Sequence, residues 1–285
     1  MRTIIGLGAA GCNIADKFAQ YSQYKIFKID VGLELGEKSK TFDFPKKGSH
    51  EAYEESCPDM KEFFGDINEE VLFIVGGSGA IAGASLRILE QIRHCRISVL
   101  YIRPEYELLS DLRKKQERVT CGILQEFARS AMINRIYLVS NSKIEQILEN
   151  VPAIGYYDKI NDAIVPTLHM INVFNHSTSV IDTFSEPIPS VRISTIGIID
   201  VETGEEKIFF DLDLVREKRY YYGINKTKLE TDGKFFTEIK ARAKKNLEEN
   251  LKKNMKVLYG LYPTEYEHDL GYILCHTNKI QLYNL

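Results

Sequence analysis

Hydrophobic residues in the first half of the chain come in short continuous runs that alternate with amphipathic stretches. The runs are rich in β-branched and aromatic residues and predict strands over residues 2–8, 24–30, 70–77, 96–104 and 135–141. The stretches predict helices over residues 13–21, 83–94, 105–132 and 143–151. Strands that are apolar on both faces and are separated by helices are typical of a parallel sheet covered on both sides, so we expect an α/β domain.

A long helix is predicted from about Tyr157 to Asn175. The evidence is a set of apolar residues that recur with the helical period of 3.6, namely Ile160, Ile164, Leu168, Ile171 and Phe174. Pro166 lies inside this pattern, where a proline can kink a helix. We expect this helix to join the first domain to the rest of the chain.

Beyond residue 178 the pattern changes to strands joined by short turns. Two strand-like runs, at 191–200 and 206–214, flank the sequence VETGE, which signals a hairpin. Further strands are predicted over 219–225, 256–262, 271–277 and 279–285, with a charged helix over about 235–254. The expected architecture is a Rossmann-like parallel-sheet domain (1–155), a long central helix (156–177) and a smaller α+β domain (178–285).

Composition limits the class of protein. With 44% hydrophobic and 27% charged residues among 285, the chain is typical of soluble globular proteins, and its net charge of -3 does not favour nucleic acid as a partner. Five scattered cysteines without a C-x-x-C pair argue against a metal cluster, and with no signal peptide expected they indicate a reducing cytoplasm. The longest apolar runs are strand-sized, far below the ~20 residues of a spanning helix, so no membrane insertion is expected.

The stretch IIGLGAAGCN at 4–13 predicts a strand, a glycine turn and the start of a helix. Small residues in such a turn let backbone N–H groups approach phosphate oxygens, and the helix N-terminus favours their negative charge. The spacing Gly6-x-Gly8-x-x-Gly11 fits a dinucleotide, and Asp30 stands about where a Rossmann acid would meet the ribose. The loop alone does not distinguish NAD, FAD or a nucleoside triphosphate, and a tight turn without a ligand is the alternative.

A second glycine-rich turn follows the strand at 70–77. It contains Gly76, Gly77, Gly79 and Gly83, together with Ser78 and small alanines. A dinucleotide domain needs only one such loop, at its first crossover. Two loops at the carboxyl edge of one sheet suit a ligand whose phosphates are held from both sides, although glycines that merely allow close helix packing give the same pattern.

Three polar residues are candidates for contact with a base. Asn141 ends a strand, where its amide can face a base edge or cap the next helix. Tyr157 and Asn161 are four residues apart and therefore share one face of the long helix. A ring and an amide on one face suit a stacked purine, while core packing of the tyrosine is the alternative.

These four segments, in this order, resemble the FtsZ/tubulin superfamily of GTPases. IGLGAAGCN is similar to the first phosphate loop of that family, and FIVGGSGAIAGASLRIL is similar to its glycine-rich signature loop. VSNSKIEQIL resembles the segment that presents an Asn to guanine, and YYDKINDAI resembles the start of the central helix. The resemblance covers roughly residues 1–185 and implies that the domain at 1–155 binds GTP or GDP with Mg²⁺.

The resemblance also implies roles for individual residues. One side of the phosphates would be lined by Gly8, Ala9, Ala10, Gly11 and Asn13, and the other by Gly77, Ser78, Gly79, Ala80 and Gly83. Asn141 and Asn161 would take the guanine base, with Tyr157 against its face. Glu105, Glu107 and Asp111 compete for the acid on the ribose, and Arg113 and Lys115 for the cation near the phosphates, from which we choose Glu107 and Arg113. The signature threonine of the family is absent.

Hydrolysis in this superfamily is completed by the neighbouring subunit, through a loop after the central helix that resembles N-x-D-x-x-D. Here HSTSVIDTFSEP at 176–187 holds that place without matching the pattern. Asp182 and Glu186 are the available acids, with Asp182 preferred, since a positioned carboxylate is needed to orient the attacking water. Ordinary loop acids are the alternative and would make a slow or inactive GTPase. Prolines at 187 and 189 replace the helix expected next, which favours a reduced member of the kind found in phages or plasmids.

The resulting hypothesis is a GTP-binding cytoskeletal protein of the cytoplasm, the host's if phage-encoded, that assembles with itself head to tail into filaments. An adaptor or cargo protein is left open, and no protein-held metal site is assigned. Two alternatives remain. An NAD(P)-dependent oxidoreductase would use the first loop and Asp30, but it gives the second loop, Asn141 and Asn161 no role. A tubulin-like module would bind GTP without polymerisation or turnover.

Overall fold

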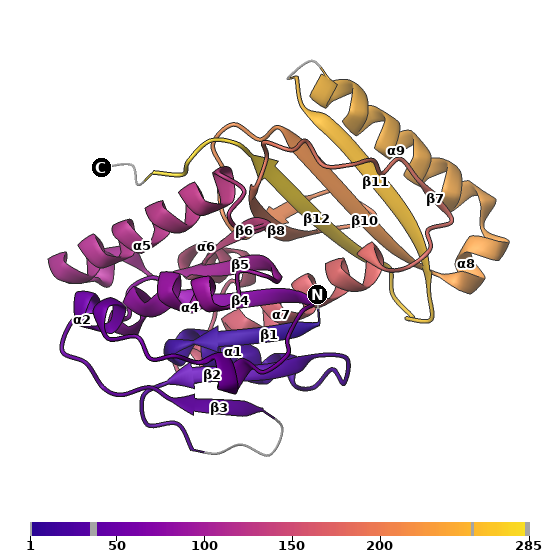
Figure 1. Cartoon of the computed structure of the whole chain (residues 1–285). Helices are drawn as coiled ribbons and strands as arrows, with labels where there is room; N and C mark the ends of the chain where they lie inside the picture. The colour runs from indigo at the N-terminus through magenta and orange to yellow at the C-terminus, as the bar shows by residue number, and fades with distance from the viewer. Residues whose placement is uncertain (1, 35–38, 252–253, 283–285) are drawn as a thin grey trace. The chain divides into compact units, whose positions relative to one another are not determined.

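The chain folds into two compact units, which are described separately (Figure 1). The computed structural model describes residues 2–34, 39–251 and 254–282. The first unit is Met1–Val165 together with Ile280–Leu285, and the second unit is Pro166–Lys279. No helix in the described part of the chain is long and apolar enough to cross a membrane.

The first unit contains a parallel sheet with the strand order β3-β2-β1-β4-β5-β6. Its strands are β1 (Thr3–Leu7), β2 (Lys25–Asp30), β3 (Lys40–Asp43), β4 (Glu70–Gly76), β5 (Arg96–Arg103) and β6 (Arg135–Ser140). All residues of β1 and β6 are buried, as the continuous apolar runs predict for strands covered on both faces. The predicted α/β fold is therefore confirmed.

Helices follow the carboxyl ends of these strands. They are α1 (Gly8–Phe18), α2 (His50–Glu55), α3 (Lys61–Phe64), α4 (Ser85–Gln91), α5 (Asp111–Arg129) and α6 (Asn141–Leu148), with short 3₁₀ helices η1 (Ala80–Ala84) and η2 (Tyr106–Leu108). Because the strands are parallel, the loops after β1, β4, β5 and β6 lie at one edge of the sheet, where ligands bind in open α/β folds.

Helix α7 (Tyr156–Asn175) is the predicted long helix, with Pro166 inside it. The predicted apolar stripe is buried, from Ile160 at 0% exposure to Phe174 at 3%. The division between the two units falls within α7, between Val165 and Pro166. The sequence instead predicts the helix as a separate segment, 156–177, between domains at 1–155 and 178–285. These domain limits remain a prediction.

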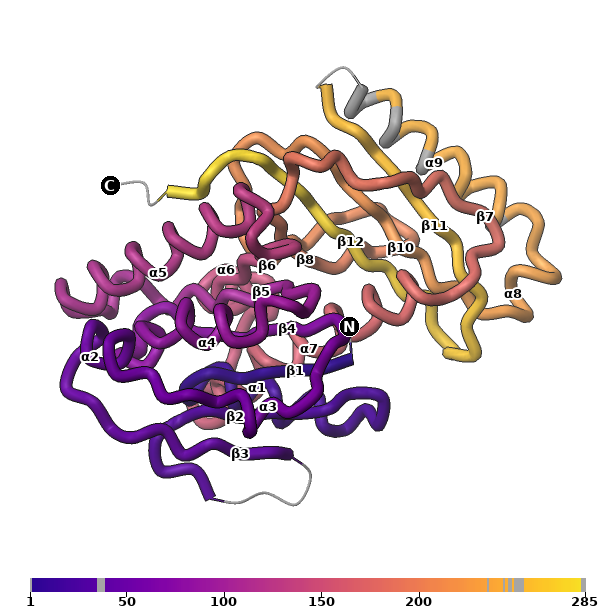
Figure 2. The backbone as a smooth tube through the Cα atoms, viewed as in Figure 1, coloured from indigo at the N-terminus to yellow at the C-terminus, as the bar shows by residue number. Residues whose placement is uncertain are grey.

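The second unit is built on a mixed sheet with the order β8-β12-β10-β11-β7, and β9 pairs with β8. Its elements are β7 (Ile181–Asp182), β8 (Ile193–Ile199), β9 (Glu206–Ile208), β10 (Glu217–Asn225), α8 (Lys226–Thr231), α9 (Gly233–Leu251), β11 (Lys256–Thr264) and β12 (Leu270–Thr277). Strands β8 and β9 form the predicted hairpin, whose turn places Gly204 at φ +78, but β9 ends at Ile208 and the strand predicted to continue to 214 does not. The parallel pair β10 and β11 is joined through α8 and α9, and α9 runs along β11 (Figure 2).

The strand predicted at 279–285 is wrong over its described residues. Residues 280–282 have no regular structure, and 283–285 lie outside the described residues. The backbone of Gln281 pairs instead with one side chain, since its N–H donates to Gln125 Oε1 at 2.7 Å and its carbonyl accepts from Gln125 Nε2 at 3.1 Å. A side-chain amide thus satisfies the polar groups that a neighbouring strand would satisfy.

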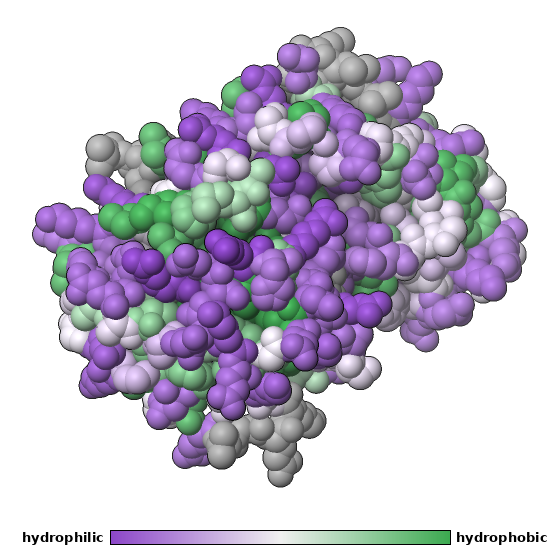
Figure 3. Space-filling view, viewed as in Figure 1, coloured by the Kyte–Doolittle hydropathy of each residue, from purple (hydrophilic) through white to green (hydrophobic). Residues whose placement is uncertain are grey.

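The surface drawn in Figure 3 is mostly hydrophilic, with a hydrophobic strip along helix α5. Exposed apolar residues on this helix are Leu112, Val119 and Ile123.

Candidate functional site

The two glycine-rich loops of the first unit lie against each other. A Cβ atom on Gly76, at the end of β4, would be 3.1 Å from the Cβ of Ala10 in α1. A Cβ atom on Gly8 would be 2.8 Å from Cγ2 of Ile81 in η1. The loops after the neighbouring strands β1 and β4 are therefore in contact.

Glycines of the first loop set the backbone path and the depth of packing. Gly8 has φ +70, which L side chains rarely adopt, so the chain turns there from β1 into α1. A Cβ atom on Gly6 would overlap the carbonyl of Gly11, and one on Gly11 would overlap the carbonyl of Ile74 in β4. Gly6 and Gly11 thus let α1 pack closely on the sheet.

The start of α1 is open to a ligand. Ala9, Ala10 and Asn13 are exposed, whereas Gly8 and Gly11 are buried. No side chain in the described part of the chain caps this end of the helix, and its first turn holds no acidic residue. Uncapped N–H groups at a helix N-terminus carry partial positive charge and accept anions well.

The second loop divides into packing glycines and surface positions. A Cβ atom on Gly77 would overlap the hydroxyl of Tyr101, and one on Gly83 would overlap the carbonyl of His50. Both glycines are buried. The part of the loop that reaches the surface contains Ser78, Gly79 and Ala80, of which Gly79 is the exposed one.

Asn141 and Asn161 are both only 7% exposed, and neither side chain forms a hydrogen bond with the described residues. Capping of the helix is the alternative role for Asn141, but Ser140 supplies the cap, since its Oγ accepts from the N–H of Lys143 at 3.4 Å. The Asn141 amide is therefore not used as a cap. Buried amides normally have partners, so two without one are candidates for ligand contact.

The start of α7 is tied to α1 and to α6. Lys17 of α1 lies 2.6 Å from Asp162 and 3.5 Å from Asp158. Tyr156 donates its hydroxyl to Glu145 of α6 at 3.0 Å. Elements that carry the first loop, Asn141 and Asn161 therefore meet within the first unit.

Tyr157 lies in the same region and is 63% exposed. Its ring meets that of Tyr156 edge-on, with centroids 5.2 Å apart. Core packing, the alternative for this tyrosine, is not what the structure shows, and its ring is accessible to a ligand.

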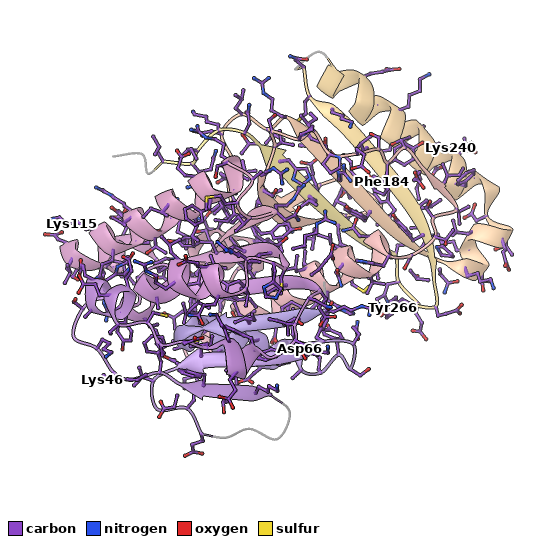
Figure 4. The ribbon with its side chains drawn as sticks, in the orientation of Figure 1. Lys46, Asp66, Lys115, Phe184, Lys240 and Tyr266 are labelled. Carbon is purple, nitrogen blue, oxygen red and sulfur yellow. The ribbon has the colours of Figure 1, made fainter. Side chains whose placement is uncertain are left out.

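The segment after β5 gathers cations that sequence reasoning did not select. Glu107 and Arg113 are exposed, and Lys115 points outward near the N-terminal end of α5 (Figure 4). The ring of Tyr106 instead has three cations within 6 Å of its centroid, from Arg103, Lys114 and Arg118. The spacing of 114 and 118 on one helix face was a signal for this cluster, but nothing in the sequence shows that Tyr106 folds back onto them.

Beneath the second loop lies a buried carboxyl group. Glu117 is 0% exposed, and its Oε1 accepts from the Tyr101 hydroxyl at 2.9 Å, while its Oε2 has no hydrogen-bond partner among the described residues. Burial raises the pKa of Glu117 to about 7, against the lowering effect of Tyr101 and Arg103. Gly77 packs directly on this pair.

Asp30, the acid that a dinucleotide would use, forms a hydrogen bond with the turn that follows it. It is half-buried, and its Oδ1 accepts from the N–H of Val31 at 2.9 Å. Burial raises the pKa of this carboxyl above its ordinary value. The arrangement explains Asp30 without a ribose.

The two acids chosen for hydrolysis belong to the second unit, and both are exposed. Asp182 uses both carboxylate oxygens locally, since Oδ1 accepts from the N–H of Phe184 at 3.1 Å and Oδ2 accepts from the hydroxyl of Ser179. The carboxylate of Glu186 makes no hydrogen bond within the described residues. Residues 183–192 contain no helix, as their prolines predict.

The sequence matches no protein-family model and none of the curated proteins. The structure is similar to a helical model of the four-stranded filament of TubZ-Bt, with a TM-score of 0.74 and 17% identity over 96% of this chain and 85% of that one. A GTPγS-form protofilament of Bacillus thuringiensis serovar israelensis TubZ gives a TM-score of 0.68, with 16% identity over 95% and 86% of the two chains. An FtsZ dimer from M. jannaschii gives 0.68, with 13% identity over 99% and 94%. The chain therefore has the fold of the tubulin/FtsZ proteins.

Proposed function

We propose that this chain, with its tubulin/FtsZ fold, is a cytoskeletal GTP-binding protein that assembles head to tail. The observation that carries the proposal is the contact between the two glycine-rich loops, Gly76 against Ala10 and Gly8 against Ile81. Two phosphate-type loops on adjacent parallel strands suit a ligand with several phosphates. A dinucleotide domain requires only the first of them.

The proposed ligand is GTP or GDP, held by both loops and by two amides. Backbone N–H groups of Ala9, Ala10 and Gly11 face the phosphates from one side, and residues 78–80 face them from the other. The amides of Asn141 and Asn161, which form no hydrogen bond with the described residues, read the guanine edge, with Tyr157 on its face. Glu107 and Arg113 remain our choice for the ribose and phosphate contacts, with the cations around Tyr106 as further positive charge.

Mg²⁺ is proposed to enter with the nucleotide. No three His, Cys, Asp or Glu side chains gather to hold a metal ion anywhere in the described ranges 2–34, 39–251 and 254–282. Mg²⁺ commonly keeps its waters and binds through phosphate oxygens with few protein ligands. When bound, it would neutralise charge on the phosphates.

Assembly is proposed from the kind of structures that share this fold. The solved relatives are described as filaments, protofilaments and a dimer, in GTPγS and GDP forms among others. Head-to-tail contacts that do not close on themselves generate filaments. In such a filament an acid from residues 176–187 of one subunit would orient the water that attacks the nucleotide of the next.

A second candidate is a GTP-binding module with slow or no turnover. The local hydrogen bonds of Asp182 favour it, because both oxygens of the preferred acid are already used. The NAD(P) oxidoreductase has no comparable support, because Asp30 is accounted for by its own turn.

Nucleotide binding is tested by titrating the chain with fluorescent GTP, ATP and NAD analogues. We expect GTP to bind at least tenfold more tightly than ATP. Replacing Asn141 or Asn161 by Ala should lower the affinity for GTP about fivefold to tenfold, which corresponds to the loss of one hydrogen bond. The matched control is Asn150→Gly, which removes an exposed amide just beyond α6 at a φ of 42 that glycine tolerates. Equal binding of ATP and GTP, or binding of NAD alone, would refute the proposal.

Assembly is tested by light scattering and sedimentation with GTP and Mg²⁺ over a range of protein concentrations. Turnover per subunit should rise with concentration, because the site is completed by a neighbour. If GTP binds but no polymer forms at any concentration, the filament part fails and the module without assembly remains.

A further inference from the structure

Residues 183–190 follow β7 without forming a helix or strand, so contacts to the rest of the second unit must hold them. Phe184 provides the apolar contact. Its ring lies 5.1 Å from that of Tyr221 and packs on Gly260, where a Cβ atom would be 2.5 Å from Phe184 Cε2. Figure 4 shows Phe184 lying over the strands of this unit.

A buried charge cluster provides the polar contacts. Glu217 in β10 is 0% exposed, and its Oε1 lies 2.6 Å from Nε of Arg219. Lys256 Nζ lies 3.8 Å from its Oε2, and His276 Nε2 lies 4.0 Å from Oε1. His276 also shares a hydrogen bond of 2.7 Å with Ser194, so it is held on both sides. A carboxylate this deeply buried is costly unless it is paired in this way.

Three members of the cluster also form hydrogen bonds with the main chain at and around Glu186. Arg219 donates to the carbonyl of Ser185 at 2.9 Å, and Lys256 donates to the carbonyl of Glu186 itself at 3.0 Å. Glu217 Oε2 accepts from the N–H of Ile188 at 3.3 Å. Three backbone positions within four residues are therefore fixed by charged groups of the sheet.

Glu186 is left with a fixed backbone and an unused carboxylate. Its side chain is exposed and makes no hydrogen bond with the described residues. Asp182 is the opposite case, because its oxygens already accept from Ser179 and Phe184. We infer that Glu186 is the acid that orients the attacking water, and that Glu217, Arg219 and Lys256 are the residues that position it. This inference rests on the proposed GTPase function.

The test is a double-substitution cycle on GTP turnover per polymerised subunit. Glu186→Gln should lower turnover about 100-fold, in the range of a lost acid–base group. Arg219→Met should lower it 10- to 100-fold, because a misplaced group loses its geometry. The double variant should be no slower than Glu186→Gln alone, since Arg219 acts only through Glu186. Affinity for GTP and the amount of sedimented polymer should not change.

Two further variants keep the test decisive if Arg219→Met fails to fold. Lys256→Met removes a partly exposed side chain that bonds the Glu186 carbonyl, and it should slow turnover several-fold with normal polymer. The control is Lys218→Met. Lys218 lies between Glu217 and Arg219 in β10, but it pairs with Glu206 and not with residues 184–188, so its loss should not change turnover.

The outcomes separate this inference from the proposed function. If the unaltered chain binds GTP and turns it over, but the effects at 186 and 219 multiply, the positioning role is refuted and the GTPase stands. Full activity of Glu186→Gln with loss in Asp182→Ala would also refute it. If the unaltered chain has no turnover at any concentration, the hydrolysis part of the proposed function is refuted, and this inference with it.

Discussion

Replacing Glu117 by Gln should change how the stability of the protein depends on pH. Glu117 is fully buried beneath Gly77, and its Oε1 accepts from the Tyr101 hydroxyl at 2.9 Å. Burial raises its pKa from the ordinary 4.5 to about 7. Gln has nearly the same shape, keeps an acceptor for Tyr101 and carries no charge at any pH.

The sign follows from which state holds the proton. Below pH 4.5 the carboxyl is protonated in the folded and the unfolded chain, so its contribution to stability is fully present. Between 4.5 and about 7 the folded chain holds a proton that the unfolded chain has released, so the free energy of unfolding falls as the pH rises. Above about 7 both states are ionised and the contribution is gone. The gap corresponds to about 3 kcal/mol, since one pKa unit is worth about 1.4 kcal/mol.

The assay is urea unfolding of both proteins at pH 5 and pH 8, followed by circular dichroism. The variant should be more stable than the unaltered chain by less than about 1 kcal/mol at pH 5 and by about 3 kcal/mol at pH 8. Glu126→Gln, an exposed change on the same helix, is the control and should give no pH-dependent difference. Parallel stability curves for Glu117→Gln and the unaltered chain would show that no buried proton is held there.

Three other predictions use different parts of the first unit. Gly11→Ala should lower stability by about 1–3 kcal/mol, because the new Cβ overlaps the sheet backbone, whereas Gly48→Ala, with open space around it, should not, as thermal melting will show. Lys17→Met should cost at most about 1 kcal/mol, since its ion pairs are half-exposed; a larger loss in urea unfolding would contradict this. Thiol titration of the folded protein at pH 8 should find one reacting cysteine, Cys57, because the other four are buried. Its reaction should be slow, since burial raises the pKa of the Cys57 thiol to about 11, and that of Cys12 to about 12. Reaction of Cys12 before Cys57 would refute this prediction.

Much of the first unit is encoded locally, which is why the sequence predicts it. Strands covered on both faces need continuous apolar runs, and the glycine loops need residues without a Cβ atom at fixed places. Strand β3 and helices α2 and α3 were not predicted, because residues 39–64 show neither a long apolar run nor a clear period. The strand predicted at 279–285 is wrong over its described residues because an apolar run does not reveal whether a partner strand is available.

The candidate site was only partly visible in the sequence, since its polar partners are distant along the chain. Nothing near Asn141 shows that Ser140 takes the cap and leaves the amide unused. Likewise, Asp182 and Glu186 are both carboxylic acids in the same loop, so the sequence does not separate them. Only the folded chain shows that both carboxylate oxygens of Asp182 accept hydrogen bonds from its own turn. Long-range hydrogen bonds of this kind depend on packing that no local pattern contains.

The pairing of Gln125 with Gln281 has a consequence for biosynthesis. The two residues are 156 positions apart, and the whole second unit is encoded between them. During translation the sheet of the first unit can form early, but the side chain of Gln125 in helix α5 lacks this partner until the second unit has been made. A ribosome-bound chain that stops at residue 279 should therefore show fast amide exchange around Gln125, and release of a longer chain should slow it.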